Sequence, residues 1–502
     1  MTQEKKDYLR YRWWEVMPGL LVWSTFAVAI ALSFIKPLWG IYFIIIFDVY
    51  WVLRVSYLFI YLMVSWFRFR RESRKHWRQK LQDDFGAGDK NWADYKHVIF
   101  LPNAKEPYEV IADTFSSLAA TDYDTSKFLI VLAFEDIDAE RNARIIESVQ
   151  SSFVSKFHKI LCTIHPKGLP GELVGKGSNL YWAGNRTKEY IDSQGWDYDK
   201  IIVSTFDIDT KPHAQYFSYL TYAFLSHLNP YRSSFQPLTL YHNNIWQSDP
   251  ITRVVANSTT FWLLTDLARS DRLFTFSSHS MSWKALVEVG FWQNNIVTED
   301  SRIFLQCLIH YDGDYQVTPI HTTVSMDTVY VGNIWRGLVN QYKQMRRWAW
   351  GVEHFPYMMW HFNQNRKIPR RKALIYLWNQ TEGVYSWATA PILIFIMGYL
   401  PLWLAERGRE TSAVAQAAPL ILSYLMTGAL FGLVVTAFMS VYILPHSPHR
   451  GWRRFLEYAL MLIQWVIFPV TMIIFGSIPA IDAQTRLMFG KYMGFWVTEK
   501  RR

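Results

Sequence analysis

The sequence predicts an α/β domain, built on an open and largely parallel sheet, that is inserted between membrane-spanning helices. Two observations lead to this prediction. Apolar residues are concentrated near both ends of the 502-residue chain, and the polar block between them holds short apolar runs followed by acidic residues. A chain of this length also exceeds what one hydrophobic core usually holds, so a folded domain with additional segments is expected.

Five apolar stretches each have about the 20 residues that a helix needs to cross a hydrocarbon core of about 30 Å. The first could instead be a cleavable signal peptide, because basic residues precede it. A second stretch begins directly after Lys36 and Pro37, however, and a helical hairpin fits better. The stretches are Pro18 to Trp39, Gly40 to Trp66, Gly383 to Leu404, Pro419 to Leu444 and Phe455 to Ile478.

Basic residues crowd the end of the second stretch. Because positive charge is retained on the cytoplasmic side, the N-terminus and the polar block are both predicted to be cytoplasmic. Anionic lipid headgroups then explain the formal net charge of +10. Nucleic acid would be an alternative partner, but the chain carries no recognisable reading motif, and no nucleic-acid binding is predicted. The basic residues are Arg68, Arg70, Arg71, Arg74, Lys75, Arg78 and Lys80.

Three apolar runs in the polar block are typical of buried parallel strands: His97 to Pro102, Phe128 to Phe134 and Lys200 to Thr205. Helical periodicity over Glu109 to Ala120 connects the first two runs. The third run leads directly into Asp207-Ile-Asp209. Acidic residues at the carboxyl ends of such strands lie where open α/β sheets bind ligands.

Asp207 and Asp209 form an Asp-x-Asp pair that can hold a hard divalent cation, which takes its remaining ligands from water and a diphosphate. Such an ion would neutralise the charge that builds on a nucleotide leaving group. An ordinary acidic turn has the same pattern, so the pair alone leaves both interpretations open. Its place after a buried strand favours the metal site. With only Cys162 and Cys307 in the chain, neither a disulfide framework nor a thiolate metal site is expected.

Glu299 and Asp300 precede Ser301 to His310, a stretch with helical periodicity. Asp300 could cap the start of that helix, which is a common role for aspartate. A carboxylate in this position could instead accept the proton of an attacking hydroxyl as a general base. By position alone the two interpretations are equally good.

Gln344-Met-Arg-Arg-Trp348 falls in a basic, aromatic stretch from Asn340 to Gly351. An amphipathic helix at the membrane surface would have this composition. In such a helix Trp348 could also stack on a sugar, while the planar guanidinium of Arg347 meets a phosphate. The two interpretations are compatible.

Together, Asp207-Ile-Asp209, Thr298-Glu-Asp300 and Gln344-Met-Arg-Arg-Trp348 resemble, in order, the motifs of the membrane-embedded, processive family 2 glycosyltransferases. That family includes cellulose, chitin and hyaluronan synthases. The resemblance covers residues 95 to 350 and has helices on both sides. It implies a GT-A-type, Rossmann-like catalytic domain that transfers sugar from a nucleotide donor, with a UDP-sugar as the expected donor.

The resemblance also implies roles for single residues. Asp207 and Asp209 would bind the diphosphate and Mg²⁺ or Mn²⁺, and Asp300, with Glu299 beside it, would be the catalytic base. Gln344, Trp348 and His279 would contact the acceptor, although a surface-loop histidine is an equal alternative for His279. The donor-binding residues would be Glu135, Asp136, Lys176, Asp207, Asp209 and Arg347.

One position departs from the family. Relatives carry Asp-Asp after the second strand, where this chain has Glu135-Asp136. A longer carboxylate could still reach the base or ribose, but the preference for a pyrimidine base becomes less secure. Lys176-Gly-Ser-Asn179 and Pro102-Asn-Ala-Lys-Glu106 resemble two further family segments near the nucleotide.

The C-terminal Phe495-Trp-Val-Thr498-Glu-Lys500 resembles the gating motif of bacterial cellulose synthase. Thr498 and Lys500 would then contact the diphosphate and help exclude water; the alternative is a basic tail on anionic lipid. Three C-terminal spans would place this tail outside, whereas its basic residues favour the cytoplasm. We expect a cytoplasmic tail, with one apolar stretch that makes an extra shallow pass or returns without crossing.

The expected organisation is a cytoplasmic segment (1–16), a transmembrane hairpin (17–67), a glycosyltransferase domain (68–330), interfacial helices with the Gln-x-x-Arg-Trp motif (331–380), transmembrane helices (381–479) and a cytoplasmic tail (480–502). The resemblance implies an inverting, metal-dependent enzyme of the plasma or bacterial inner membrane that extends and exports a polysaccharide. A glycosyltransferase that adds one sugar to a lipid carrier is the alternative, and a catalytically silent glycan transporter is the third. A second copy or an accessory subunit is a further expected partner.

Overall fold

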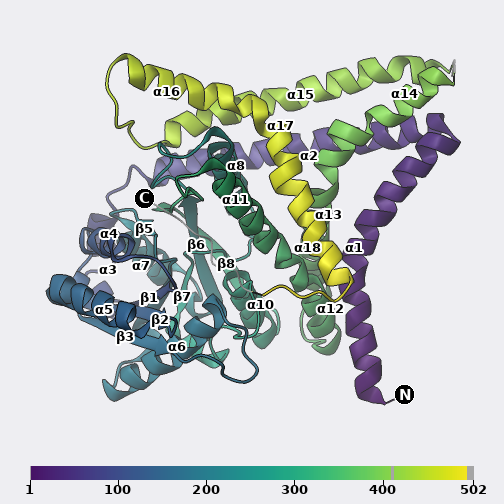
Figure 1. The fold of residues 1–502 in the computed structure, drawn as a ribbon. Coiled ribbons are helices and arrows are strands. Elements are labelled where there is room, and N and C mark those ends of the chain that lie inside the picture. The colour runs from purple at the N-terminus through teal and green to yellow at the C-terminus, as the bar shows by residue number, and fades with distance from the viewer. Residues whose placement is uncertain (1, 409–411, 495–502) are drawn as a thin grey trace.

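The computed structural model describes residues 2–408 and 412–494, and its polar block is built on one eight-stranded sheet (Figure 1). The strands lie in the order β3-β2-β1-β4-β7-β6-β8-β5. The three predicted strands correspond to β1, β2 and β4 and are confirmed. The strands are β1 Lys96–Asn103, β2 Phe128–Glu135, β3 Lys159–His165, β4 Ile201–Thr205, β5 Lys211–Pro212, β6 Ser233–Leu240, β7 Ser280–Ser282 and β8 Gln316–Ser325.

The first half of the sheet is parallel and the second half is mixed. β1 lies between β2 and β4 and is parallel to both, and β3 extends this part beyond β2. β7 then runs antiparallel to β4 and β6, while β8 pairs parallel with β6 and antiparallel with β5. The parallel strands end at one edge, which brings Asn103, Glu135 and the chain after Thr205 to the same side of the domain.

Helices cover both faces of the sheet, and each face has its own hydrophobic core. On one face, Val98, Phe100 and Val131 pack with α6, α8, α9 and α10. On the other, Ile99 and Leu101 pack with α3, α4, α5 and α7. The helices are α3 Trp77–Phe85, α4 Tyr108–Ala119, α5 Ala139–Phe153, α6 Lys176–Ser193, α7 Tyr216–Ser226, α8 Pro250–Leu267, α9 Trp283–Glu288 and α10 Glu299–His310.

Five helical segments are long and apolar enough to cross a membrane, as the sequence predicts: Gln3–Ile35, Pro37–Glu72, Arg370–Arg407, Ala413–Ile443 and Trp452–Met488. Each one begins before its apolar stretch, but the first ends at Ile35, before Trp39, because α2 begins at Pro37, and the fourth ends at Ile443. The third includes α13 Arg370–Ile392, a π-helical turn and α14 Tyr399–Arg407. The fifth includes α16 Trp452–Ile463, α17 Phe468–Thr471, a π-helical turn and α18 Ile478–Met488. α1, α2 and α15 are the first, second and fourth, and α11 Ile334–Ala349 and α12 His354–Gln364 precede α13.

These helices form two groups (Figure 1). α2 and α15 lie side by side across the top of the view, whereas α1, α13 and α18 gather beside the sheet domain. The fifth segment bends after α16, which packs on α15, so that α18 lies against α1 and α11. Arg12 donates to the carbonyl oxygens of Leu487 (3.3 Å) and Met488 (3.1 Å), so α18 ends beside the N-terminal turns of α1. The last described residues therefore lie near the N-terminal end of α1.

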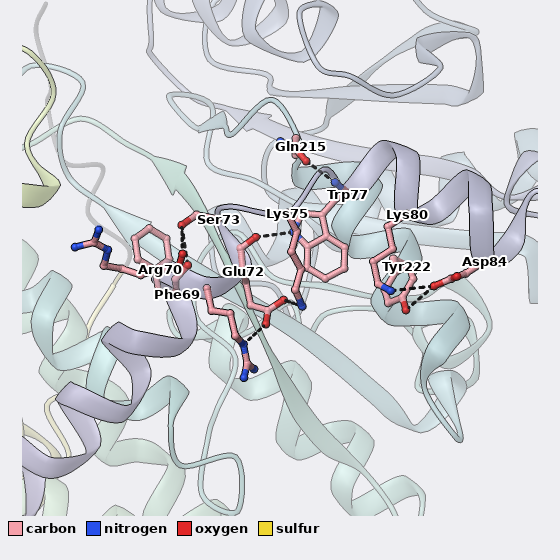
Figure 2. A network of polar contacts seen from close by, with 11 residues as sticks. Phe69, Arg70, Glu72, Ser73, Lys75, Trp77, Lys80, Asp84, Gln215 and Tyr222 are labelled. Carbon is pink, nitrogen blue, oxygen red and sulfur yellow. Dashed lines mark hydrogen bonds and ion pairs between the residues drawn. The ribbon is translucent and has the colours of Figure 1, made fainter.

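A polar network joins α2 to the sheet domain (Figure 2). Glu72, in the last turn of α2, accepts hydrogen bonds from Arg71 (3.0 Å) and Lys75 (2.5 Å). The indole of Trp77 donates to the carbonyl oxygen of Glu72 (3.1 Å), and the Trp77 backbone amide donates to Gln215 Oε1 (2.6 Å). These bonds fix the direction in which the chain leaves the second apolar helix.

Substitution of Trp77 tests this junction. The Trp77 side chain is 5% exposed and stacks on Tyr219 with ring centroids 3.8 Å apart. We expect Trp77→Ala to lower the free energy of unfolding by about 3–5 kcal/mol, because a large buried side chain is removed. Thermal unfolding in lipid nanodiscs measures this change. Trp335→Ala, at a side chain that is 78% exposed, is the matched control; equal melting temperatures for the two variants would contradict the packing role.

Candidate active site

Asp207 and Asp209 lie in a tight turn directly after β4. The amide of Phe206 donates to the carbonyl oxygen of Phe100 on β1, and the amide of Thr210 donates to that of Asp207 (2.9 Å). Asp209 is 2% exposed, and its Oδ2 accepts a hydrogen bond from the amide of Asp327 (3.0 Å). The turn is thus held by β1 on one side and by the chain after β8 on the other.

Lys176 connects the predicted metal site with the predicted catalytic base. It is the first residue of α6, and its Nζ donates to Asp207 Oδ1 (2.7 Å) and to Asp300 Oδ2 (2.6 Å). Glu299 Oε1 lies 3.7 Å from the same nitrogen. Three carboxylates, one from the turn after β4 and two from α10, therefore surround one ammonium group.

This cluster is buried enough for its charges to interact strongly. The Lys176 side chain is 10% exposed, and those of Asp207 and Asp300 are 28% and 21% exposed. Burial alone would lower the pKa of Lys176, but the charges of Asp207, Asp300 and Glu299 hold it above its ordinary value. Lys176 thus stays charged at any physiological pH.

The two carboxylates at the start of α10 have different environments. Thr298 is the N-cap residue and makes no side-chain capping bond, so the alternative role of Asp300 as the cap is not observed. Burial, and then the neighbouring charge of Asp300, raise the pKa of Glu299 well above its ordinary value. A carboxyl group that keeps its proton near neutral pH cannot accept another one. Asp300 is therefore the better candidate for the base.

Several side chains that the sequence did not single out hold Asp300 in place. The hydroxyl of Thr275 donates to the carbonyl oxygen of Asp300 (2.6 Å). Glu353 accepts a hydrogen bond from Thr298 and another from the indole of Trp350 (2.9 Å). The turn that follows α11 and the start of α10 are thereby tied together. No linear motif marks the two contacts with the start of α10, because Thr275 and Asp300 are 25 residues apart and Thr298 and Glu353 are 55 residues apart.

His279 is buried, so the alternative of a surface-loop histidine is wrong. It follows Ser278, whose φ of 69° marks a tight turn, and its Nδ1 is 2.9 Å from the carbonyl oxygen of Phe276. Burial lowers the pKa of His279, with the charge of Asp300 acting in the opposite direction. The imidazole is thus neutral near pH 7 and lies close enough to Asp300 to sense its charge.

Gln344 and Trp348, on the last turns of α11, line one cavity together with Tyr241. The rings of Trp348 and Tyr241 have centroids 5.8 Å apart. Burial and the charges of Asp207 and Asp209 raise the pKa of Tyr241, which places its hydroxyl in the field of the acidic turn. The charge of Arg347 acts in the opposite direction on the pKa of Tyr241 and of Glu299, without outweighing burial, so Arg347 lies near both groups. The Gln-x-x-Arg-Trp segment therefore adjoins the acidic cluster.

Two hydrogen bonds to α18 fix the orientation of α11. Arg346 Nη1 donates to Asp482 Oδ2 on α18 (2.9 Å), and the hydroxyl of Tyr342 donates to the same oxygen (3.2 Å). α18 belongs to the last apolar segment. α11, which lines the cavity beside Trp348, is thus bonded directly to a helix that is apolar and long enough to belong to a membrane span.

Glu135, at the end of β2, is held by a histidine that the sequence did not indicate. His165 Nδ1 lies 3.0 Å from Glu135 Oε2, and His165 Nε2 lies 2.9 Å from Glu172 Oε2. Asn294 donates to the other oxygen of Glu172 (3.0 Å). Asp136 is fixed by its backbone, because its amide donates to the carbonyl oxygen of His165 (3.0 Å). The Glu135-Asp136 pair is therefore tied to the end of β3.

The contacts of His165 with Glu135 and Glu172 should stabilise the protein in a pH-dependent way. Burial lowers the pKa of His165, but hydrogen bonds to Glu135 and Glu172 outweigh it and raise the pKa above its ordinary value near 6.5. The stabilisation is then complete below about pH 6.5 and is lost as the pH rises through the folded-state pKa. We expect His165→Gln to lower the melting temperature more at pH 6 than at pH 8.5. An equal loss at both values would contradict a charged His165.

The donor set fits a hard divalent cation that completes its shell from a ligand. Asp207 and Asp209 offer carboxylate oxygens one residue apart, which suits Mg²⁺ or Mn²⁺ bound together with a diphosphate. Across residues 2–408 and 412–494, no group of three or more His, Cys, Asp or Glu side chains could hold a metal without such a ligand. Thr498 and Lys500 lie outside the described residues.

The sequence matches no protein-family model and no curated protein. Among solved structures, the chain is similar to the mannosyltransferase PcManGT from Pyrobaculum calidifontis in complex with GDP-Man and Mn²⁺. The identity is 15%, the match covers 84% of this chain and 97% of that one, and the TM-score is 0.44.

The chain is also similar to S. aureus TarS 1-349 in complex with UDP-GlcNAc and with UDP. Both matches have 12% identity and cover 69% of this chain and 91% of that one, with TM-scores of 0.31 and 0.33. Nucleotide sugars or a nucleotide are the ligands of these three structures. Because the TM-scores lie below 0.5, the likenesses assign no function to this chain.

Proposed function

We propose that this chain is an inverting, metal-dependent family 2 glycosyltransferase of GT-A type, which moves a sugar from a nucleotide donor to a growing polysaccharide at the cytoplasmic face of a membrane. The observation that carries the proposal is the position of Lys176 between Asp207 and Asp300. One ammonium group within 2.7 Å of both carboxylates means that a donor held at Asp207 has its reacting carbon close to Asp300. The ordered motifs of the sequence support the same assignment.

The reaction follows from this arrangement. Asp300 removes the proton of the acceptor hydroxyl while that oxygen attacks the anomeric carbon of the donor. The bond from this carbon to the diphosphate breaks, and the electron pair leaves with the diphosphate. Lys176 lies beside Asp207 and Asp300 and stabilises the negative charge on the leaving diphosphate. One direct displacement inverts the configuration, so an α-linked donor gives a β-linkage.

Asp207 and Asp209 would hold the divalent cation together with the diphosphate. When bound, the ion supplies positive charge that stabilises the departing nucleotide. The chain's own residues hold the pair ready for it: the amide of Asp327 fixes Asp209, and Lys176 balances the charge of Asp207. Arg347 adds a second positive charge on the side of the Gln-x-x-Arg-Trp segment.

The acceptor would lie against Gln344, Trp348 and Tyr241, with His279 near the base. An aromatic side chain such as Trp348 offers a flat apolar surface on which a sugar ring can stack. Since α11 is bonded to α18, the product would leave the site beside the apolar helices. This arrangement supports synthesis coupled to export across the plasma or bacterial inner membrane, with the catalytic domain in the cytoplasm.

Product analysis tests the proposal. The purified protein in lipid nanodiscs is supplied with radiolabelled nucleotide sugars and Mg²⁺ or Mn²⁺, and the products are separated by size. We expect long β-linked chains. A single sugar on an extractable lipid would instead establish the lipid-carrier enzyme, and a folded protein that transfers no label would contradict the assignment.

A further inference from the structure

The contacts of α2 show which ends of the apolar helices lie together. Ile41, near the start of α2, packs in one cluster with Ala405 of α14 and Ala418 of α15. The end of α14 and the start of α15 therefore lie on the side of the molecule where α2 begins, which we call the far side. The other end of α2 is bonded to the sheet domain through Glu72 (Figure 2). These two ends define the two sides of a membrane that α2 crosses.

α15 returns from the far side to the side of the sheet domain. Near its end, the ring of Tyr442 lies 5.3 Å from that of Trp66 in the last turns of α2, and the guanidinium of Arg70 lies 4.5 Å from the Tyr442 ring. α16 then packs against the sheet domain, where the rings of Tyr458 and Trp246 have centroids 5.5 Å apart. The fifth apolar segment, Trp452–Met488, therefore begins on the side of the sheet domain.

The fifth segment also ends on this side. Its π-helical turn reaches the middle of the third segment, where the hydroxyl of Ser477 donates to the carbonyl oxygen of Trp387 (3.1 Å). α18 then runs back: Gln484 donates to the carbonyl oxygen of Val384 (2.9 Å), and the helix ends beside Arg12. Because α1 joins α2 directly on the far side, the N-terminal turns of α1 lie on the side of the sheet domain.

We propose that the fifth apolar segment is a re-entrant hairpin, which enters the membrane from the side of the sheet domain, turns near the middle and returns to the same side. Its first arm, α16, lies in that leaflet and binds the anionic headgroups. Among the described residues, four segments then cross: α1, α2, α13 with α14, and α15. Sugar transfer plays no part in this placement, so its tests stand apart from those of the proposed function.

The backbone between the two arms fits a re-entrant segment. A 3₁₀ turn at Gln464–Ile467 and a π-helical turn at Met472–Ser477 interrupt the α-helix. Irregular backbone at membrane depth is tolerated where protein covers it. Trp465 and Phe475 are 3% and 6% exposed and pack in clusters that include residues of α8 and α11. The turn of the hairpin is thus supported by the sheet domain.

α16 has the composition of a helix at a membrane surface. Its exposed apolar side chains recur every three or four residues and so share one face, and exposed arginines crowd its start. Such a face enters the acyl region while the arginines meet anionic headgroups. The apolar residues, which are 42% to 69% exposed, are Trp452, Phe455, Leu456, Leu460 and Ile463. The arginines are Arg450, Arg453 and Arg454.

Labelling of single cysteines in the full-length protein tests the hairpin. Sealed vesicles, in which Asp83→Cys of α3 reacts with a membrane-impermeant maleimide, have the sheet domain outside. In the same kind of vesicle we expect His446→Cys, before α16, and Lys491→Cys, after α18, to react as well. Glu406→Cys, at the end of α14, should react only after the vesicles are opened. All four residues are exposed.

Two results would overturn the hairpin. Protection of Lys491→Cys together with Glu406→Cys would mean that the fifth segment crosses the membrane. Reaction of Glu406→Cys in sealed vesicles, or protection of His446→Cys, would mean that the preceding segments do not alternate between the two sides. Cys162→Ser is the background for every variant, since Cys307 is 0% exposed and should not react.

Quenching by spin-labelled lipids tests the placement of α16. A bimane on Leu460→Cys should be quenched more by a lipid that carries its nitroxide near the headgroup than by one that carries it near the chain end. The opposite order is expected for a bimane on Phe431→Cys, which is 66% exposed near the middle of α15. The same order at both positions, or no quenching at Leu460→Cys, would contradict a shallow position of α16 in the leaflet.

The same label tests the preference for anionic lipid. Spin-labelled phosphatidylglycerol should quench the bimane on α16 more strongly than spin-labelled phosphatidylcholine, and Arg453→Gln with Arg454→Gln should lower this ratio by about fivefold. Arg144→Gln with Arg186→Gln, at exposed residues of α5 and α6, is the matched control and should keep the ratio. Equal quenching by the two lipids in the wild type would overturn the headgroup assignment.

Discussion

Asp300→Asn is expected to reduce sugar transfer by about 10²- to 10⁴-fold, which is the range for loss of a general base. Asparagine has nearly the same shape and can still accept a hydrogen bond from Lys176, but it cannot take a proton. Nucleotide binding should change little, because Lys176 and Asp207 remain in place. The turnover rate and the donor affinity, measured on the same preparation, separate these two effects.

The control for this variant is Asp83→Asn, which makes the same change at an exposed residue of α3. Its transfer rate should equal that of the wild type. If Asp300→Asn retained most of the activity, the base would have to be another group. Glu299 would not be a suitable replacement, because burial raises its pKa and keeps it protonated near pH 7.

Asp207→Asn should abolish metal-dependent donor binding. Loss of residues that only support a metal ligand already costs about 10- to 100-fold in metal affinity or activity, so removal of a ligand itself should cost more than about 100-fold. Chelation of the metal should weaken donor binding in the wild type by a similar factor. Titration of the wild type and the variant with a nucleoside diphosphate, with and without Mg²⁺, measures both effects.

The same titration can contradict the metal site. Donor binding that is tight in Asp207→Asn, or that does not respond to Mg²⁺ in the wild type, would show that Lys176 and Arg347 hold the diphosphate without a cation. Asp199→Asn, in the short turn before β4, is a control for general effects of charge removal on the domain, since Asp199 pairs with Lys284 on the surface.

Much of the fold could be predicted from local patterns. The runs at His97, Phe128 and Lys200 are strands because their side chains are apolar on both faces, as buried parallel strands require. The apolar stretches are long enough to be recognised by length and composition alone. The start of α10 at Glu299 agrees with the helical periodicity that follows it. The mixed half of the sheet, with its short strands β5 and β7, has no comparable pattern.

The candidate residues could be recognised as motifs in the sequence, but their positions relative to one another could not. The position of Lys176 between two acidic motifs depends on how α6 packs against β4 and α10, and so do the contacts of Thr275 and Glu353 with the start of α10. Similarly, His279 looked like a loop residue because its neighbours are serines, yet the turn at Ser278 directs it into the core. His165 belongs to no recognisable motif, because its role depends on its contacts with Glu135 and Glu172.

The most direct test of the central claim is nucleotide release by the purified protein in lipid nanodiscs, across UDP-, GDP- and dTDP-sugars with Mg²⁺ or Mn²⁺. The wild type is predicted to release nucleotide from at least one donor, while Asp300→Asn releases almost none. Equal release by the wild type and Asp300→Asn, or no release from any donor by a correctly folded wild type, would contradict a sugar transfer built on Asp207, Lys176 and Asp300.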